Sequence, residues 1–169
     1  MITLHVTQQF SVRERFTVTD DQGTVRYSVD GSFFRIPKEF RITDAAGNMV
    51  ARLWKVPISL MPRYILEIGG EKAALIQQRF TMLRKRLTVT PIGSYSDIEV
   101  RGDIWNMNFD LFRRGRPVGH VGQKWLSLRD RFTIVVEEPS AEILVVSIVV
   151  AIDHIKRMEA RSASAAAAG

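Results

Sequence analysis

Hydrophobic and polar side chains alternate along most of the first 138 residues. In residues 16–19, 40–43, 87–90 and 109–112 an apolar side chain occupies at least every second position. A period of two predicts β-strands that turn one face toward a core and the other toward solvent. Valine, isoleucine, threonine and phenylalanine are frequent in these runs, as is usual for strands. The pattern therefore predicts a mainly β protein.

Turn signals that contain glycine divide these runs at a regular interval. Glycine accepts the positive φ that tight hairpin turns require. Successive turn glycines are separated by 24, 23, 23 and 22 residues, and they are Gly23, Gly47, Gly70, Gly93 and Gly115. Each interval has room for two strands and a second chain reversal, so a strand with its turn takes about 11 or 12 residues. On that spacing, residues 1–138 hold about twelve strands.

Internal similarity also indicates repeated hairpins. Val29-Asp30-Gly31 followed by Phe40-Arg41-Ile42 is similar to Val100-Arg101-Gly102 followed by Phe109-Asp110-Leu111. The segments that begin at Gly47, Gly70 and Gly115 share a second scheme of glycine, two variable positions and a small apolar residue. An ancestral duplication and a pattern common to all hairpins both produce such similarity, and both predict a β-meander.

The carboxyl-terminal run Ile143–Ile152 differs from the strands because it is almost entirely apolar. Pro139-Ser140 followed by Glu142 is typical of a helix start, with Ser140 as the N-cap and an acidic residue in the first turn. A helix that is apolar on every face must be enclosed on every face. Since the pattern predicts strands for the rest of the chain, the sheet must close around this helix. We therefore predict a closed antiparallel barrel of about twelve strands around a central hydrophobic C-terminal helix.

The expected domain organisation follows from this barrel. Residues 1–161 form one domain, with strands over about 1–138 and the central helix over about 140–160, and residues 162–169 form a flexible tail. A helix about 10–12 Å across, with sheet packed about 10 Å away, needs a wall of roughly ten tilted strands. Two other interpretations of the apolar run stay open, a buried β-strand and a short segment that dips into a membrane. Ile155 and Met158, at helical spacing after the run, favour the helix.

Composition and charge narrow the class of partner. The chain of 169 residues is 46% hydrophobic and 25% charged, which is typical of one globular domain. It contains no cysteine, so disulfides, zinc–thiolate sites and thiol nucleophiles are excluded. A net charge of +6 favours anionic partners such as lipid headgroups or nucleic acid. The polar residues among positions 1–9 argue against a signal peptide, so we expect a cytoplasmic protein, peripheral to the membrane if it acts there.

Several segments spread from about Gln8 to Met158 form a recognisable set. They are Tyr27-Ser-Val-Asp-Gly31, Phe40-Arg-Ile-Thr-Asp44 with Gly47, Pro62-Arg63-Tyr64, Ile98-Glu-Val-Arg-Gly102-Asp-Ile-Trp105, Asn108-Phe109, Gly122-Gln-Lys124-Trp125 with Ser127 and Asp130, and Ile152-Asp153. In this set the chain resembles the LURP-one-related family, especially its small bacterial members, within the superfamily of Tubby-like and scramblase-like domains. The resemblance implies a barrel of twelve strands around a hydrophobic carboxyl-terminal helix.

The resemblance implies little about activity. Bacterial LURP-one-related proteins have no established catalytic activity, so the resemblance implies none for this chain, whereas Tubby-like domains bind phosphoinositides through basic residues. Scramblases are associated with lipid movement and calcium, but their acid-rich segment before the terminal helix is not reproduced here. The acids nearby are Glu137, Glu138 and Glu142, which lack the alternating spacing of a calcium loop. We therefore expect a binding module without a metal or another cofactor.

The sequence contains no recognisable catalytic motif. His5, His120 and His154 are scattered without metal-ligand spacing, and glycine-rich phosphate loops and nucleophile elbows are lacking. Two acid pairs are conceivable for general acid–base chemistry, Asp97 with Glu99 and Asp103 with Asp110. Turns and exposed strand faces also explain these carboxylates, so we do not expect an enzyme.

Basic clusters are the better functional candidates. The candidate residues for an anionic ligand are Arg79, Arg84, Lys85, Arg86, Arg113, Arg114 and Arg116. If Leu83, Leu87 and Val89 face the core, Arg84 and Arg86 point outward and Lys85 indicates a bulge or a turn. The alternative for these clusters is a solvated strand face that blocks edge pairing.

Two further groups are expected to be structural. Lys124-Trp125 with Arg129 and Arg131 forms a third basic stretch, in which Trp125 packs and Lys124 lies across apolar surface. Asp153 directly follows the apolar run and is expected at a barrel mouth, paired with an arginine or lysine from a strand end.

Two functions therefore remain open from the sequence. One is a module that docks anionic phospholipid headgroups or other phosphate-bearing ligands through basic loop ends. The other is a scaffold that works through protein contacts, with the positive charge serving only solubility. Nucleic-acid binding is unlikely, because no aromatic residues are interleaved with the lysines and arginines for base stacking.

Overall fold

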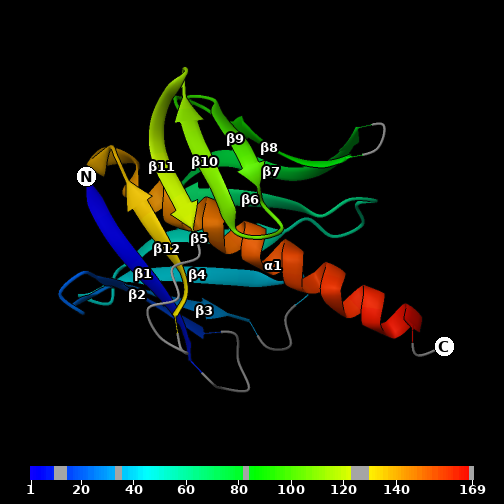
Figure 1. Cartoon of the computed structure of the whole chain (residues 1–169), viewed down its shortest axis with the longest axis horizontal. Helices are drawn as coiled ribbons and strands as arrows, with labels where there is room; N and C mark the ends of the chain where they lie inside the picture. Colours follow the sequence, from blue (N-terminus) through cyan, green and yellow to red (C-terminus); the bar gives the residue numbers. More distant parts are fainter. Residues whose placement is uncertain (10–14, 33–35, 82–83, 123–129, 168–169) are drawn as a thin grey trace.

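The protein is a closed antiparallel barrel with its last helix inside (Figure 1). The structure is a computed structural model that describes residues 1–9, 15–32, 36–81, 84–122 and 130–167. Within these ranges twelve strands follow one another around the wall, and the first strand closes against the last. The strands are β1 (Ile2–Gln9), β2 (Arg15–Asp20), β3 (Val25–Gly31), β4 (Glu39–Asp44), β5 (Met49–Lys55), β6 (Arg63–Ile68), β7 (Glu71–Thr81), β8 (Arg84–Pro91), β9 (Ile98–Asp103), β10 (Asn108–Arg113), β11 (Arg116–Gly122) and β12 (Asp130–Val136). The fold class predicted from the sequence is confirmed.

Alternation along each strand sorts side chains between the barrel interior and the surface. On β4, Phe40 and Ile42 are fully buried, whereas Arg41 between them is exposed. The five turn glycines have φ between +67° and +86°, so the hairpin turns predicted at Gly23, Gly47, Gly70, Gly93 and Gly115 are confirmed. Their regular spacing has a simple cause, because one of these turns follows every second strand.

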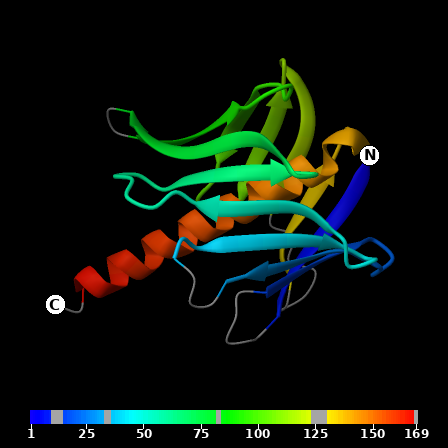
Figure 2. The ribbon, with the colours of Figure 1, turned by 180° about the vertical axis from the view of Figure 1, so that it is seen from behind.

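The strand directions give the barrel two unlike ends. All five glycine turns lie at one end, which we call the glycine end. The opposite end, the loop end, carries the connections at residues 36–38, 56–62 and 104–107. The helix begins at the glycine end and leaves the barrel at the loop end, beyond which it projects (Figure 2).

The helix α1 (Glu142–Ala167) follows a short 3-10 turn, η1 (Pro139–Ala141). Every residue from Leu144 to Ile155 is buried, so the apolar run is an enclosed helix rather than a strand of the wall. Of the helices described here, none has the length and apolar character needed to cross a bilayer.

Two details of the predicted helix were wrong. The helix continues to Ala167, so residues 162–167 of the predicted tail are helical and exposed, consistent with the high helix propensity of alanine. Ser140 lies inside η1 and is not an N-cap. Its hydroxyl donates to the Glu138 carboxylate at 2.5 Å, which removes it from the helix amides.

An ion pair ties the start of the helix to the wall. The Arg26 guanidinium on β3 donates to both carboxylate oxygens of Glu142 at 2.9 Å, and Glu142 is buried. Burial, followed by the nearby Glu142 charge, raises the pKa of the Tyr27 phenol to about 12. The acidic first-turn residue expected at the helix start is therefore present, and its role is to dock the helix against β3.

Polar side chains also hold the helix where it leaves the barrel. Asp153 is buried and pairs with Arg157, one helical turn further on, at 2.7 Å. The predicted ion pair with a strand end is not among the contacts described, because the partner of Asp153 is on the same helix. The contact with the wall comes from Arg157, whose guanidinium lies over the Phe16 ring of β2, 4.8 Å from the centroid. The neighbouring ring of His154 packs edge-on against Phe40, with the ring centroids 4.9 Å apart.

The two halves of the barrel, β1–β6 and β7–β12, repeat each other in register. Gly31 pairs with Phe40 between β3 and β4, as Gly102 pairs with Phe109 between β9 and β10. The internal similarity seen in the sequence therefore corresponds to hairpins six strands apart.

Gly102 bends β9 closely against its neighbour. Its φ is +115°, and a Cβ at this position would lie 2.8 Å from the Asn108 carbonyl oxygen and 2.9 Å from the Phe109 Cα. Both contacts are to backbone of β10, which cannot move aside cheaply.

We predict that Arg26→Ala destabilises the protein more than Glu142→Gln does. Without Arg26 a buried carboxylate loses its cation, which costs about 2 kcal/mol. Without the Glu142 charge, water solvates the Arg26 guanidinium, which is 42% exposed, at a cost of about 1 kcal/mol or less. Urea unfolding of both variants measures the difference. The opposite order would mean that the charge of Glu142 is not held by Arg26.

We also predict that Gly102→Ala lowers the free energy of unfolding by about 2 kcal/mol or more, because it combines backbone strain with a clash. Gly115→Ala is the matched control. Gly115 also has a positive φ, but a Cβ added there would meet nothing within 4 Å, so strain alone costs about 1 kcal/mol. Equal losses in thermal or urea unfolding would show that the approach of β9 to β10 is looser than described.

Candidate anion-binding site

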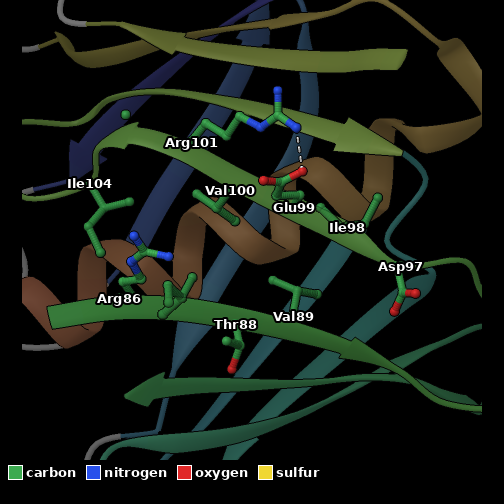
Figure 3. Close-up of a pocket in the computed structure, with 11 residues that line it drawn as sticks. Arg86, Thr88, Val89, Asp97, Ile98, Glu99, Val100, Arg101 and Ile104 are labelled. Atoms are coloured by element: carbon green, nitrogen blue, oxygen red, sulfur yellow. Dashed lines mark hydrogen bonds and ion pairs between the residues drawn. The ribbon is translucent and has the colours of Figure 1, made fainter. Parts of the chain in front are cut away.

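The barrel wall is incomplete between β8 and β9. In the described part of the wall, every other neighbouring pair of strands is joined over at least four residue pairs, whereas β8 and β9 are joined only at Val89 and Ile98. From that point the two strands diverge toward the loop end. The wall therefore has an open seam, and the helix runs behind it (Figure 3).

The open seam forms a cleft of about 600 Å³. Its lining comes from β8, β9 and the residues next to β9: Arg86, Leu87, Thr88, Val89, Asp97, Ile98, Glu99, Val100, Arg101, Gly102 and Ile104. Apolar and polar side chains alternate along both strands of the lining, with Thr88 between Leu87 and Val89 and Glu99 between Ile98 and Val100. A concave site of this size is suited to a small ligand or to part of a larger one.

Arg86 provides the clearest positive charge of the cleft. Its side chain is exposed and extends into the gap between the strands, while Asp97 lies at the far end of the cleft (Figure 3). Arg86 is directly opposite Arg79 in the β7–β8 ladder, and Arg79 is also exposed. Like charges opposite each other on antiparallel strands destabilise the pair. Among the described residues, neither arginine has an ion-pair partner, so an anion would relieve this repulsion.

Arg101 is the second arginine of the cleft. Its guanidinium pairs with Glu99 at 2.6 Å and lies over the Phe112 ring, 4.5 Å from the centroid. The Glu99 and Arg101 side chains are 59% and 54% exposed. The hydrogen bond from Arg101 lowers the pKa of Glu99. An exposed pair of this kind contributes about 1 kcal/mol or less, so Arg101 can exchange Glu99 for another anion at little cost.

The structure places part of the predicted basic cluster at the cleft. Arg79 and Arg86 lie near its loop end, and Arg84 and Lys85 are the first two residues of β8, although their side chains are outside the described part. Of the two alternatives predicted at Lys85, a bulge and a turn, the bulge was wrong, and the hairpin end comes just before Arg84, which pairs with Thr81. The β7–β8 ladder keeps one register over all its pairs, because both strands simply continue to the hairpin end.

The other predicted cluster lies at the opposite end of the barrel. Arg113, Arg114 and Arg116 surround the turn at Gly115, which is at the glycine end. Arg113 pairs with Glu138 at 2.8 Å. The structure therefore does not bring the two clusters together. The third basic stretch, at Lys124 and Trp125, lies outside the described residues.

Sequence reasoning missed Arg101 as a site residue. The signal was available, because Val100-Arg101-Gly102 matches Val29-Asp30-Gly31 except at the middle position, where an acid is replaced by a base. What the sequence did not reveal is that the strands separate beside this substitution.

Several other acids and histidines form contacts outside the cleft. Asp103 accepts hydrogen bonds from the amides of Trp105 and Asn106, which lower its pKa and fix the β9–β10 turn. Asp110 pairs with His120 at 2.7 Å, and His5 pairs with Asp21 at 2.9 Å. Among the described residues, no group of three or more acidic, histidine or cysteine side chains could hold a metal ion.

The loop end also exposes large apolar side chains. Ile36 lies in the β3–β4 connection, and Ile58 and Leu60 lie in the β5–β6 connection, all almost completely exposed. The Lys55 amide donates to the Lys38 carbonyl at 2.8 Å, which holds the two connections side by side. Ile58 has a φ of +55°, an unusual conformation for a β-branched residue.

Comparisons with known proteins agree with this fold. The family model described as LURP-one-related matches residues 2–153. The uncharacterized protein YxjI of Bacillus subtilis (strain 168) is 24% identical over 156 residues, which cover 92% of this chain and 94% of YxjI. The X-ray structure of the Arabidopsis thaliana protein AT5G01750 superposes with a TM-score of 0.68 at 16% identity, covering 91% of this chain and 90% of that one.

At 16% identity, the Arabidopsis structure shows the shared fold alone. The family match spans almost the whole barrel and the buried part of the helix, and with the barrel itself it supports a binding-type module. The resemblance inferred from the sequence is thereby confirmed, and this chain belongs to the LURP-one-related family.

Proposed function

We propose that the protein is a cytoplasmic, non-enzymatic module that binds phosphate-bearing ligands at the open seam, and that anionic phospholipid headgroups at a membrane surface are the main source of that phosphate. The observation that carries the proposal is the juxtaposition of Arg79 and Arg86 on neighbouring strands beside the cleft, with Arg101 on its other wall. Guanidinium groups form paired hydrogen bonds with phosphate oxygens.

The exposed apolar side chains support a membrane as the source of the ligand. Ile36, Ile58 and Leu60 lie at the same end of the barrel as Arg79 and Arg86. Apolar residues that project from loops near basic residues suit the boundary between headgroups and acyl chains. An anionic surface attracts each nearby Lys or Arg by about 1 kcal/mol.

The partners of the acids and histidines support a role without catalysis. Asp103, Asp110 and Glu99 are each held by a turn or an ion pair. None of them faces a neighbouring nucleophile among the contacts described.

A protein-interaction scaffold is the second candidate. The same exposed apolar residues, Ile36, Ile58 and Leu60, would favour it if the arginines had no role.

We predict that the protein sediments with vesicles containing phosphatidic acid and not with vesicles of phosphatidylcholine alone. Replacing both Arg79 and Arg86 by alanine removes about 2 kcal/mol of attraction, and so weakens binding about 30-fold. Arg114→Ala combined with Arg116→Ala is the matched control, because it removes the same charge from the opposite end of the barrel.

Equal sedimentation with neutral and acidic vesicles would contradict the proposal. So would equal losses in the two double variants, because net charge alone would then explain binding. Binding that is lost on changing Ile58 and Leu60 to serine, with no dependence on acidic lipid, would favour the protein scaffold.

A further inference from the structure

The open seam has an equivalent in the first half of the barrel, between β2 and β3. β2 reads Arg15-Phe-Thr-Val-Thr-Asp20, and β8 contains Arg86-Leu-Thr-Val-Thr-Pro91. The register is also the same, because Val18 pairs with Tyr27 as Val89 pairs with Ile98. Each residue of the first seam therefore has a counterpart 71 positions later in the second.

The first seam is joined through to its loop end. From Val18 and Tyr27 the ladder continues through three more pairs, the last of which joins Arg15 to Asp30. The Arg15 guanidinium donates to the Asp30 carboxylate at 2.7 Å. The hollow beside this ion pair is only about 270 Å³. An arginine–carboxylate pair across the strands thus accompanies a joined seam.

The second seam lacks this carboxylate. The counterpart of Arg15 is Arg86, and the counterpart of Asp30 is Arg101, so the pair of opposite charges has become a pair of like charges. The ladder that continues in the first seam is interrupted here after Val89 and Ile98. Arg101 turns instead to Glu99 on its own strand, at 2.6 Å.

We propose that a phosphate anion takes the place of the missing carboxylate, bridging Arg86 and Arg101 and drawing β8 and β9 into the ladder seen between β2 and β3. This inference rests on the proposed function, since it assigns the ligand of the same cleft a definite position and a structural effect. The phosphate of a lipid headgroup and free phosphate both have the chemistry required. Amide hydrogen exchange of the protein, measured in the presence of each ligand in turn, distinguishes the two sources.

The interior of the seam favours closure once the charges are neutralised. Leu87, Val89 and Ile98 line the cleft and keep 8%, 6% and 5% of their surface exposed, whereas many wall residues such as Phe40 are at 0%. Pairing of the strands would bury this remaining apolar surface. The ion pair of Arg101 with Glu99 is exposed and weak, so its loss opposes closure only slightly.

Amide hydrogen exchange of the full chain tests the inference. Alternate amides of an antiparallel strand point to opposite neighbours, so some amides of residues 86–88 and 99–101 are held by β7 and β10. The amides in these two segments that point across the seam should exchange rapidly without ligand and about tenfold more slowly with inorganic phosphate at ten times its Kd. Sodium chloride at the same ionic strength should have no such effect. Vesicles of phosphatidylcholine with phosphatidic acid form the second arm, which asks whether a lipid phosphate protects the same amides.

Two charge substitutions should reverse which seam is joined and which one responds to phosphate. Arg101→Asp should restore the ion pair across the strands, so that the amides of residues 86–88 and 99–101 that point across the seam are protected without phosphate and phosphate adds nothing. Asp30→Arg should open the first seam, so that the amides of residues 15–17 and 28–30 that point across it, rather than to β1 or β4, exchange rapidly and become protected by phosphate. The measurements on the unsubstituted chain decide the inference even if a variant fails to fold.

The results separate this inference from the proposed function. Vesicle binding that depends on Arg79 and Arg86, with no change in exchange at the seam, overturns the bridging anion and leaves the membrane proposal standing. Protection by inorganic phosphate without vesicle binding supports the bridging anion and rejects the membrane as its source. No protection and no binding with either ligand overturns both.

Discussion

Enclosure of a helical segment that is almost entirely apolar is the constraint on which the rest of this structure depends. From Leu144 to Ile152 the helix has no face that can be left in water, so its free energy is lowered only if the wall surrounds it completely. A closed barrel buries the apolar surface of the helix and at the same time leaves no free strand edge. The ion pair of Glu142 with Arg26 then fixes where the helix enters the barrel, and Arg157, which lies over the Phe16 ring of β2, contacts the wall where the helix leaves.

Such a barrel has almost no interior left for a ligand, because the helix fills it. A binding site must therefore form at an end or where the wall itself is interrupted. The seam between β8 and β9 is such an interruption, and beside it two arginines occupy the places of an arginine and an aspartate in the other half. A repeated fold offers the same position twice, so one copy can remain structural while the other changes its chemistry.

The two ends of the barrel differ for a related reason. The turns at Gly23, Gly47, Gly70 and Gly115 have two to four residues, whereas the β3–β4 and β5–β6 connections at the loop end have seven each and expose Ile36, Ile58 and Leu60. The interrupted seam opens toward this same end. Charge, apolar surface and the only wide gap in the described wall are thus gathered on one side of the molecule, although they come from separate parts of the sequence.

The sequence by itself determined the architecture, because the evidence for it is local. Alternating side chains, glycines at positions that need a positive φ, and a decapeptide apolar on every face each restrict the backbone without knowledge of distant residues. Only the tertiary structure decided which residues lie together at the candidate site. Whether Arg86 stays near Arg101, and whether Arg114 lies at the same end as Arg79, depends on strand direction and on pairing between segments far apart in the chain. The ladder between β8 and β9 could not be judged from either strand alone, since each has an ordinary strand pattern and the charges conflict only when the two meet.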